Sequence, residues 1–181
     1  ISASQQKYIT SLHLKKYRQK YRNFLVEGEK MVRELLILPP GRMNIVSIYG
    51  TERWLAENEP LLGPFYEKFN TVTEQDLKKV GTLVTPNQVL AVAELPDPEQ
   101  DALPNPNALS LYLDGIQDPG NMGTILRIAD WFGLSRVWCA EGCVDVFSPK
   151  VVQAGMGACF RVPVTESASL TTLLARTPEI P

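Results

Sequence analysis

The spacing of apolar residues over the first 95 positions switches repeatedly between the helical and the strand pattern. Residues 4–20 place apolar side chains at helical intervals with lysines around the remaining surface, which predicts one helix. Short apolar runs predict strands at 24–26, 45–49 and 89–93. Helices are predicted at 29–38, from Gly50 onward, and from Thr73 onward with Thr73 as N-cap. This alternation favours an α/β layer arrangement over a helical bundle.

Residues 96–107 separate this region from one with a different pattern. Prolines stand at 96, 98, 104 and 106 with acidic and amide residues between them, and such a stretch cannot hold regular structure. We therefore expect a small domain over 1–95, a semi-rigid linker over 96–107 and a second domain over 108–181.

The second region predicts a strand, a helix and a strand. Residues 109–113 are a near-continuous apolar run, of the kind that is buried on both faces of a parallel sheet. A helix over about 121–132 follows, which Gly133 can end in the left-handed conformation. Residues 137–140 predict the next strand, which completes a βαβ unit with an expected right-handed crossover. A helix at 149–156, a strand at 161–164 and a helix at 169–174 are expected to follow.

Charge is distributed unevenly, although the net charge of the 181 residues is only −2. Residues 1–36 contain eight basic and three acidic residues, a balance of +5, so the remainder carries −7. A basic arm on an acidic body suggests a surface that faces a polyanion. A solvated helix face explains the same charges, and charge alone does not decide between the two.

The composition argues for a protein of a reducing compartment. The hydrophobic content of 44% and the charged content of 21% are ordinary for globular proteins, and no apolar run suits a membrane span or a signal peptide. The three cysteines are odd in number, and the spacing of Cys139 and Cys143 with a single distant His13 does not make a zinc site. We expect free thiols, no metal, no membrane association and a cytoplasmic location.

The loop after residues 109–113 contains the most informative residues. Asp118-Pro119-Gly120 predicts a tight turn, Asn121 can cap the following helix, and Gly123 allows close backbone approach. The segment contains neither the dinucleotide-binding glycine pattern nor a Walker lysine. From spacing alone, a plain cap and an exposed Arg127 are the favoured interpretation. A phosphate-binding turn at a helix N-terminus is a further alternative.

The residues of this loop resemble a known motif. Asp118-Pro119-x-Asn121-x-Gly123-x-x-x-Arg127, which follows an apolar strand, looks like motif 1 of the SpoU-type (TrmH-like, SPOUT superfamily) RNA ribose 2′-O-methyltransferases. Residues 147–158 are similar to the next segment of that family. Residues 22–28 and 85–92 resemble the ribosomal-protein-type RNA-binding domain that many members contain. The resemblance covers nearly the whole chain.

This resemblance implies methyl transfer from S-adenosylmethionine to a ribose 2′-hydroxyl of structured RNA, with ribosomal RNA favoured over tRNA. The implied fold is a small α/β/α RNA-binding domain followed by the first part of a parallel-sheet, trefoil-knot α/β domain. By analogy, Asn121 organises the active-site loop and Arg127 lies at the reacting centre. Arginine stays protonated, so we expect Arg127 to grip an RNA phosphate and to stabilise the developing alkoxide rather than act as a base.

The first domain is then expected to select the RNA. Its phosphate contacts are predicted to be basic residues of the arm, namely Lys15, Lys16, Arg18, Lys20 and Arg22. Tyr17 and Tyr21 can stack on unpaired bases, but aromatic residues at helical spacing are more often in the core, and a core position is the favoured interpretation.

SpoU-type enzymes contain two further motifs, which form most of the cofactor pocket and the knot. Nothing after Val164 supplies them. We therefore expect an incomplete catalytic domain that is inactive by itself, with the cofactor-binding residues unassigned, and a homodimer in the full-length protein. The alternative is a non-catalytic RNA-binding protein with a truncated methyltransferase half.

Overall fold

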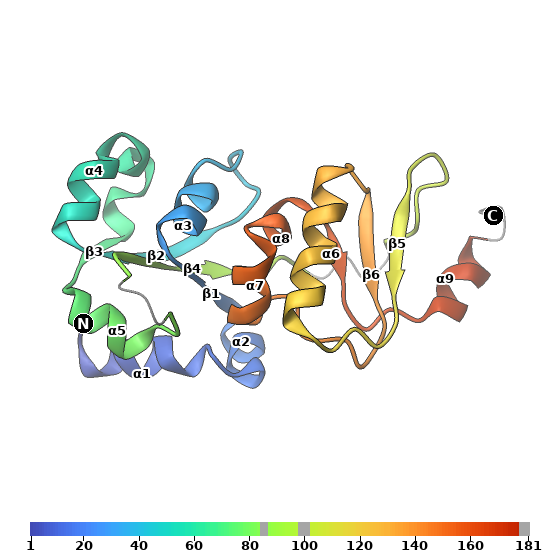
Figure 1. Cartoon of the computed structure of the whole chain (residues 1–181), viewed down its shortest axis with the longest axis horizontal. Helices are drawn as coiled ribbons and strands as arrows, with labels where there is room; N and C mark the ends of the chain where they lie inside the picture. Colours follow the sequence, from blue (N-terminus) through green and yellow to red (C-terminus); the bar gives the residue numbers. More distant parts are fainter. Residues whose placement is uncertain (84–86, 98–101, 178–181) are drawn as a thin grey trace. The chain divides into compact units, whose positions relative to one another are not determined.

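The structure, a computed structural model, describes residues 1–83, 87–97 and 102–177 (Figure 1). It divides into two compact units. The first comprises Ile1–Pro96 with Phe147–Pro149, and the second Asp97–Val146 with Lys150–Pro181. The predicted linker therefore lies partly outside the described residues, as do Thr85 and Pro86 of the second RNA-binding segment.

The first unit contains a mixed sheet of four strands. Its elements are α1 (Ala3–Ser11), α2 (Lys15–Tyr21), β1 (Asn23–Glu27), α3 (Glu29–Leu36), β2 (Ile45–Gly50), α4 (Glu52–Leu62), the 3-10 helix η1 (Gly63–Lys68), β3 (Phe69–Thr71), α5 (Glu74–Val80) and β4 (Val89–Glu94). The strand order is β1-β4-β2-β3, in which β4 is antiparallel to both neighbours and β2 is parallel to β3. The predicted strands β1, β2 and β4 are confirmed. The short β3, which has only three residues, was not predicted.

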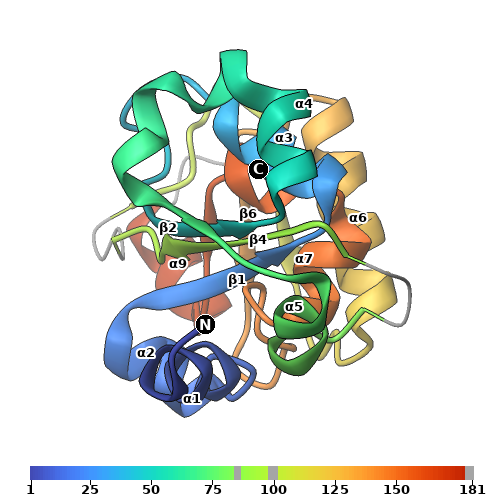
Figure 2. The same ribbon diagram turned by 90° about the vertical axis from the view of Figure 1, so that its left-hand side faces the viewer.

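Helices cover both faces of this sheet. Figure 2 shows α1, α2 and α5 on one side and α3 and α4 on the other. The core on the first side joins α1 and α5 to alternate residues of three strands. It contains Ile9, Leu12, Leu25, Tyr49, Val72, Leu77, Val80, Leu90 and Val92. Residues 89–93 are buried on both sides because β4 lies between two neighbours and two helical layers. The predicted α/β/α layering is confirmed.

The single helix predicted over residues 4–20 is wrong, because the chain breaks between α1 and α2. The break is stabilised by Arg18, which is 3% exposed and whose Nη1 donates to the Leu12 carbonyl oxygen at 2.7 Å. A ring nitrogen of His13 also lies 2.7 Å from the Val80 carbonyl oxygen. The first contact satisfies a carbonyl group at the end of α1, and the second links the turn to the end of α5.

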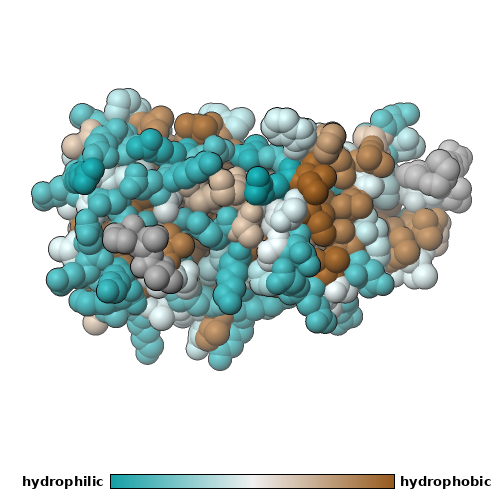
Figure 3. All heavy atoms as spheres, viewed as in Figure 1, coloured by the Kyte–Doolittle hydropathy of each residue, from teal (hydrophilic) through white to brown (hydrophobic). Residues whose placement is uncertain are grey.

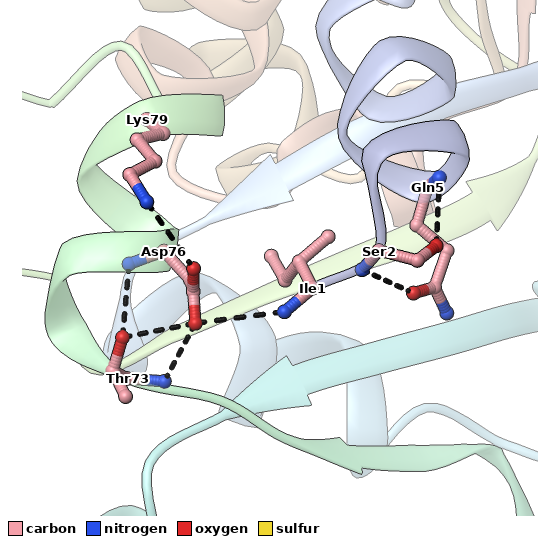
Figure 4. A network of polar contacts seen from close by, with 6 residues as sticks. All are labelled: Ile1, Ser2, Gln5, Thr73, Asp76 and Lys79. Carbon is pink, nitrogen blue, oxygen red and sulfur yellow. Dashed lines mark hydrogen bonds and ion pairs between the residues drawn. The ribbon is translucent and has the colours of Figure 1, made fainter.

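Capping boxes begin two of these helices (Figure 4). Thr73 is confirmed as the N-cap of α5: its hydroxyl accepts from the Asp76 N–H at 3.2 Å, and the Asp76 carboxylate accepts from the Thr73 N–H. Ser2 and Gln5 make the corresponding pair at α1. Hydrogen bonds from Thr73 lower the pKa of the Asp76 carboxyl, as expected of an ionised acid at a helix N-terminus.

The second unit has a parallel sheet with the order β5-β6-β7. Its elements are β5 (Ser110–Leu113), α6 (Pro119–Trp131), β6 (Arg136–Cys139), α7 (Pro149–Gly155), α8 (Ala158–Arg161), β7 (Val164–Thr165) and α9 (Leu170–Arg176). The predicted βαβ unit is confirmed as β5-α6-β6. The α/β class predicted for both parts of the chain is also confirmed.

Two expectations for this sheet are wrong. The strand predicted to be buried on both faces is only half-buried over Ser110–Tyr112, because β5 lies at the edge of the described sheet. The strand predicted at 161–164 is displaced, because residues 158–161 form α8 and β7 begins at Val164. Met156, with φ 49°, ends the preceding helix in the left-handed conformation, which explains why the helical segment is divided.

Candidate functional site

The loop that follows β5 enters α6 through a cap made by Asp118. The Asp118 carboxylate accepts a hydrogen bond from the Asn121 N–H at 2.7 Å, and Pro119 occupies the first turn. The prediction that Asn121 caps the helix is therefore wrong. Asn121 lies inside the first turn, and its exposed side chain is not used in the cap.

Gly123 allows the close approach that the sequence predicted. A Cβ atom at this position would lie 2.5 Å from Ala154 Cβ and 2.7 Å from both Ala154 C and Gly155 N. The backbones of α6 and α7 are therefore in contact, and no side chain fits between them. The contact fixes which face of α6 is buried: Met122, Gly123, Leu126 and Ala129.

Arg127 lies on the exposed side of α6. Helical geometry separates it from Asn121 by about 9 Å along the axis and about 120° around it. Asp130 is the acid that helical spacing would offer to Arg127, but its carboxylate pairs with Arg161 at 2.7 Å. Within the described part of the chain, no hydrogen bond or ion pair engages the Arg127 guanidinium. Its donors are therefore available to an anionic ligand.

The loops at the carboxyl ends of β5 and β6 are joined by backbone hydrogen bonds. The Ala140 N–H donates to the Leu113 carbonyl and the Val144 N–H to the Ile116 carbonyl, both at 2.8 Å. Open α/β sheets bind ligands at this edge. A pocket for S-adenosylmethionine must enclose its adenine, its amino-acid end and its sulfonium. The polar residues Asp114 and Gln117 are exposed here and do not enclose such a group, so we assign no residue of this chain to the cofactor.

The three cysteines all lie in the described part of the chain, where their surroundings show whether they could bind a metal ion. All three are free, and no group of three or more His, Cys, Asp or Glu side chains in this part of the chain is able to hold a metal ion. Burial raises the pKa of the Cys139 and Cys159 thiols to about 12, so both are neutral, unreactive thiols at physiological pH. None of the described helices has the length and apolar character of a membrane span.

The basic residues predicted to bind RNA fall into two groups. Lys15, Lys16 and Lys20 on α2 are exposed. Arg18 is buried against the end of α1, so its predicted role as a phosphate contact is wrong. Arg22 is half-buried, and its Nη2 donates to the Leu95 and Pro96 carbonyls at 3.3 and 2.9 Å. Three of the five residues therefore remain as surface cations.

The preference for a core position of the two tyrosines on α2 is wrong for Tyr21, which is 40% exposed. Tyr17 is half-buried. Helical spacing alone did not reveal this, because α2 is a separate short helix and not the continuation of α1.

Sequence reasoning also missed an apolar surface on α6. Ile128, Trp131 and Phe132 are 50%, 85% and 72% exposed. Figure 3 shows apolar side chains gathered over this helix. We call these three residues the α6 apolar surface. The adjacent Trp131-Phe132 pair just before Gly133 was the available signal, since two large apolar side chains stand there at the end of the helix.

Two family models match the chain. Residues 108–180 match the SpoU rRNA Methylase family, and residues 4–91 match the MRM3-like substrate binding domain. Among curated proteins, mitochondrial rRNA methyltransferase 3 of Xenopus laevis is 34% identical over 168 residues, which are 89% of this chain and 39% of the relative. The 23S rRNA (guanosine(2553)-2′-O)-methyltransferase RlmP of Bacillus subtilis is 33% identical over 156 residues, or 84% of this chain and 58% of the relative.

Solved structures show the same likeness. A TrmH-family protein from Porphyromonas gingivalis has a TM-score of 0.84 and 41% identity, and the alignment covers 98% of this chain and 67% of that one. An AdoMet-bound rRNA methyltransferase from Sinorhizobium meliloti has a TM-score of 0.80 and 24% identity, with 99% and 67% covered, which is a likeness of fold. The chain spans about two fifths of the length of the curated relatives it matches first.

The contact at Gly123 gives a direct test of this packing. Gly123→Ala is expected to lower the free energy of unfolding by about 1–3 kcal/mol, because the overpacking exceeds the gain of about 1 kcal/mol in helix propensity. Urea denaturation measures the change. Gly155→Ala is the matched control, since its added Cβ would meet nothing closer than 3.8 Å. Equal stability of the two variants would contradict the close approach.

Proposed function

Because the chain belongs to the SpoU rRNA methylase family, we propose that the full-length protein transfers a methyl group from S-adenosylmethionine to a ribose 2′-hydroxyl of ribosomal RNA. The observation that supports it most is the loop-helix motif at the carboxyl edge of the parallel sheet, with Asn121 and Arg127 both exposed on α6. Ribosomal RNA is favoured over tRNA because the relatives from Xenopus laevis and Bacillus subtilis are both named as rRNA methyltransferases.

Arg127 supplies the electrostatic part of this reaction in our proposal. Its guanidinium is always protonated, so it does not remove the proton of the 2′-hydroxyl. It grips an RNA phosphate by paired hydrogen bonds and stabilises the negative charge that develops on the ribose oxygen. Asn121, about 1.7 turns nearer the loop, orients the loop that receives the nucleotide. S-adenosylmethionine would supply the methyl group from its sulfonium, with the neutral thioether as leaving group. The RNA phosphate that Arg127 holds takes the proton of the 2′-hydroxyl.

The first unit selects and holds the RNA. The match to a substrate-binding domain supports this role, as does the exposure of Lys15, Lys16 and Lys20 on one short helix. The first 26 residues contain no acidic residue, so these cations face little local competition. Contacts of this kind give affinity for phosphates and little sequence preference.

We further propose that the full-length protein is a homodimer and works in the cytoplasm. The dimer is supported by the α6 apolar surface, because exposed apolar groups of this size commonly mark an interface. A two-fold dimer would pair this surface with itself. The free cysteines support a reducing compartment.

Arg127→Ala in the full-length protein is expected to reduce turnover at least about 100-fold while RNA affinity changes little, because the charge acts mainly on the transition state. Turnover is measured by single-turnover methylation of ribosomal RNA with labelled S-adenosylmethionine, and RNA affinity is measured by filter binding. Arg33→Ala, which removes another exposed helical arginine, is the control and should keep full turnover. Turnover near the wild-type value in the Arg127 variant would remove this residue from the mechanism. An inactive wild-type protein would instead support the non-catalytic alternative.

Reversing the charge of Lys16 and Lys20 to glutamate is expected to weaken RNA binding and to reduce the slope of log K against log salt by about 1.5–2, because two phosphate contacts are lost. The control reverses Lys30 and Arg33, which are exposed on α3 at the opposite face of the sheet. Fluorescence anisotropy over a salt series measures the RNA affinity and the salt slope of each variant. An unchanged slope in the Lys16/Lys20 variant would count against α2 as the RNA surface.

Replacing Trp131 and Phe132 by glutamate is expected to convert the full-length dimer into a monomer, because charge at a desolvated interface is strongly unfavourable. Light scattering with size-exclusion chromatography gives the mass. Tyr66→Glu, at an exposed position of the first unit, should leave the dimer intact. A wild-type monomer would refute the dimer. A dimeric but less stable variant would show that the remainder of the same chain covers this surface.

A further inference from the structure

Helix α2 presents two tyrosine rings together with two lysines. Tyr17 and Tyr21 are four residues apart and so lie on one side of the helix. Their rings are nearly parallel, with an interplanar angle of 14° and centroids 6.2 Å apart. Tyr21 is 40% exposed, so part of its ring is accessible to a ligand.

The Tyr21 ring packs against Tyr8 of α1, which is itself hydrogen-bonded to Asn23 of β1. Tyr8 of α1 meets Tyr21 edge to face, with centroids 5.2 Å apart and an interplanar angle of 80°. The Tyr8 hydroxyl accepts a hydrogen bond from Asn23 Nδ2 of β1 at 2.6 Å. Burial raises the pKa of the Tyr8 phenol, which keeps it neutral. The orientation of Tyr21 is therefore set before any ligand arrives, which lowers the entropic cost of binding.

Two ammonium groups accompany these rings. Lys16 Nζ lies 4.9 Å from the centroid of Tyr17, and Lys20 Nζ lies 5.4 Å from that of Tyr21. Both lysines are exposed, and cation–π contacts at exposed sites are weak, so a phosphate can draw either ammonium away. The surface thus combines a partly exposed aromatic ring with two ammonium groups, one over each tyrosine.

We propose that Tyr21, with Tyr17 beside it, is a stacking platform for an unpaired RNA base, and that Lys16 and Lys20 contact the flanking phosphates. This inference rests on the proposed RNA substrate and deepens it by naming the class of structure recognised. Bases inside a duplex are stacked on one another and cannot use such a platform, whereas loop or bulge nucleotides can. The first unit would therefore prefer RNA with splayed bases over continuous duplex.

The test compares two RNA probes on the full-length protein. One is a hairpin with 2-aminopurine in an unpaired loop, and the other is a fully paired duplex of equal length and charge. For the loop probe, Tyr21→Leu is expected to weaken binding about 5- to 150-fold and to abolish the quenching of 2-aminopurine. The salt slope should not change, since no charge is lost. Binding of the duplex should be unaffected.

Three further variants control for folding and charge. Tyr21→Phe keeps the ring and should bind the loop probe as the wild type does, whereas Tyr21→Leu keeps an apolar contact with Tyr8 but has no aromatic face. Tyr66→Leu removes a more exposed ring elsewhere in the unit, at 69% against 40% for Tyr21, and should have no effect. The Lys16/Lys20 double glutamate variant should weaken the binding of both probes and lower the salt slope, so loss of charge and loss of stacking are separable.

Two results would overturn the platform. Equal weakening of loop and duplex binding in Tyr21→Leu would show that the ring supports the surface without touching a base. Unchanged loop binding in that variant would show that the ring has no part in recognition, although the RNA-binding role of the unit would stand. If the wild-type protein bound neither probe, the proposed RNA-binding role itself would fail, and the platform with it.

Discussion

The arrangement of the candidate active site depends on how closely α6 approaches α7. Because Gly123 has no side chain, the backbone of α6 lies against Ala154 and Gly155. This contact fixes which face of α6 is buried. The helical repeat then determines which residues point outward. Asn121 and Arg127 are exposed on the helix whose position the Gly123 contact fixes. The same contact therefore determines both the packing of this unit and the exposure of its polar side chains.

A buried cation has a comparable role in the first unit. Arg18 donates to the carbonyl that ends α1, which stabilises the turn between α1 and α2. The direction of α2 follows from this turn, and with it the exposure of Lys15, Lys16 and Lys20. A positive residue in the core therefore positions the positive residues on the surface. The distribution of charge along the sequence could not distinguish the buried cation from the exposed ones, because each contributes one positive charge to the arm.

The elements that the sequence predicted well are those set by local spacing. The strands β1, β2 and β4 are short apolar runs, and Thr73 shows the capping-box pattern with Asp76 three residues later. The break after α1 was not predictable in this way, since it depends on Arg18 six residues away and on Val80, 67 residues from His13. Asp118 and Asn121 are both good N-caps. The position of Pro119, which favours the first helical residue, was the signal that identifies Asp118 as the cap.

The roles of the basic residues could not be predicted from the sequence, because they depend on which side-chain donors already bind other groups of the protein. Arg18 and Arg22 direct their guanidinium groups to backbone carbonyls and stabilise the fold. Arg127 has an acid three residues away, but Asp130 pairs with Arg161 of α8 instead. An arginine whose neighbouring acid is bound to another partner keeps its paired donors for a ligand, and such a planar fork matches a phosphate or a carboxylate. The ion pair between Asp130 and Arg161 therefore leaves Arg127 without its nearest acidic partner on α6, and the proposed role of Arg127 in RNA methylation rests on this.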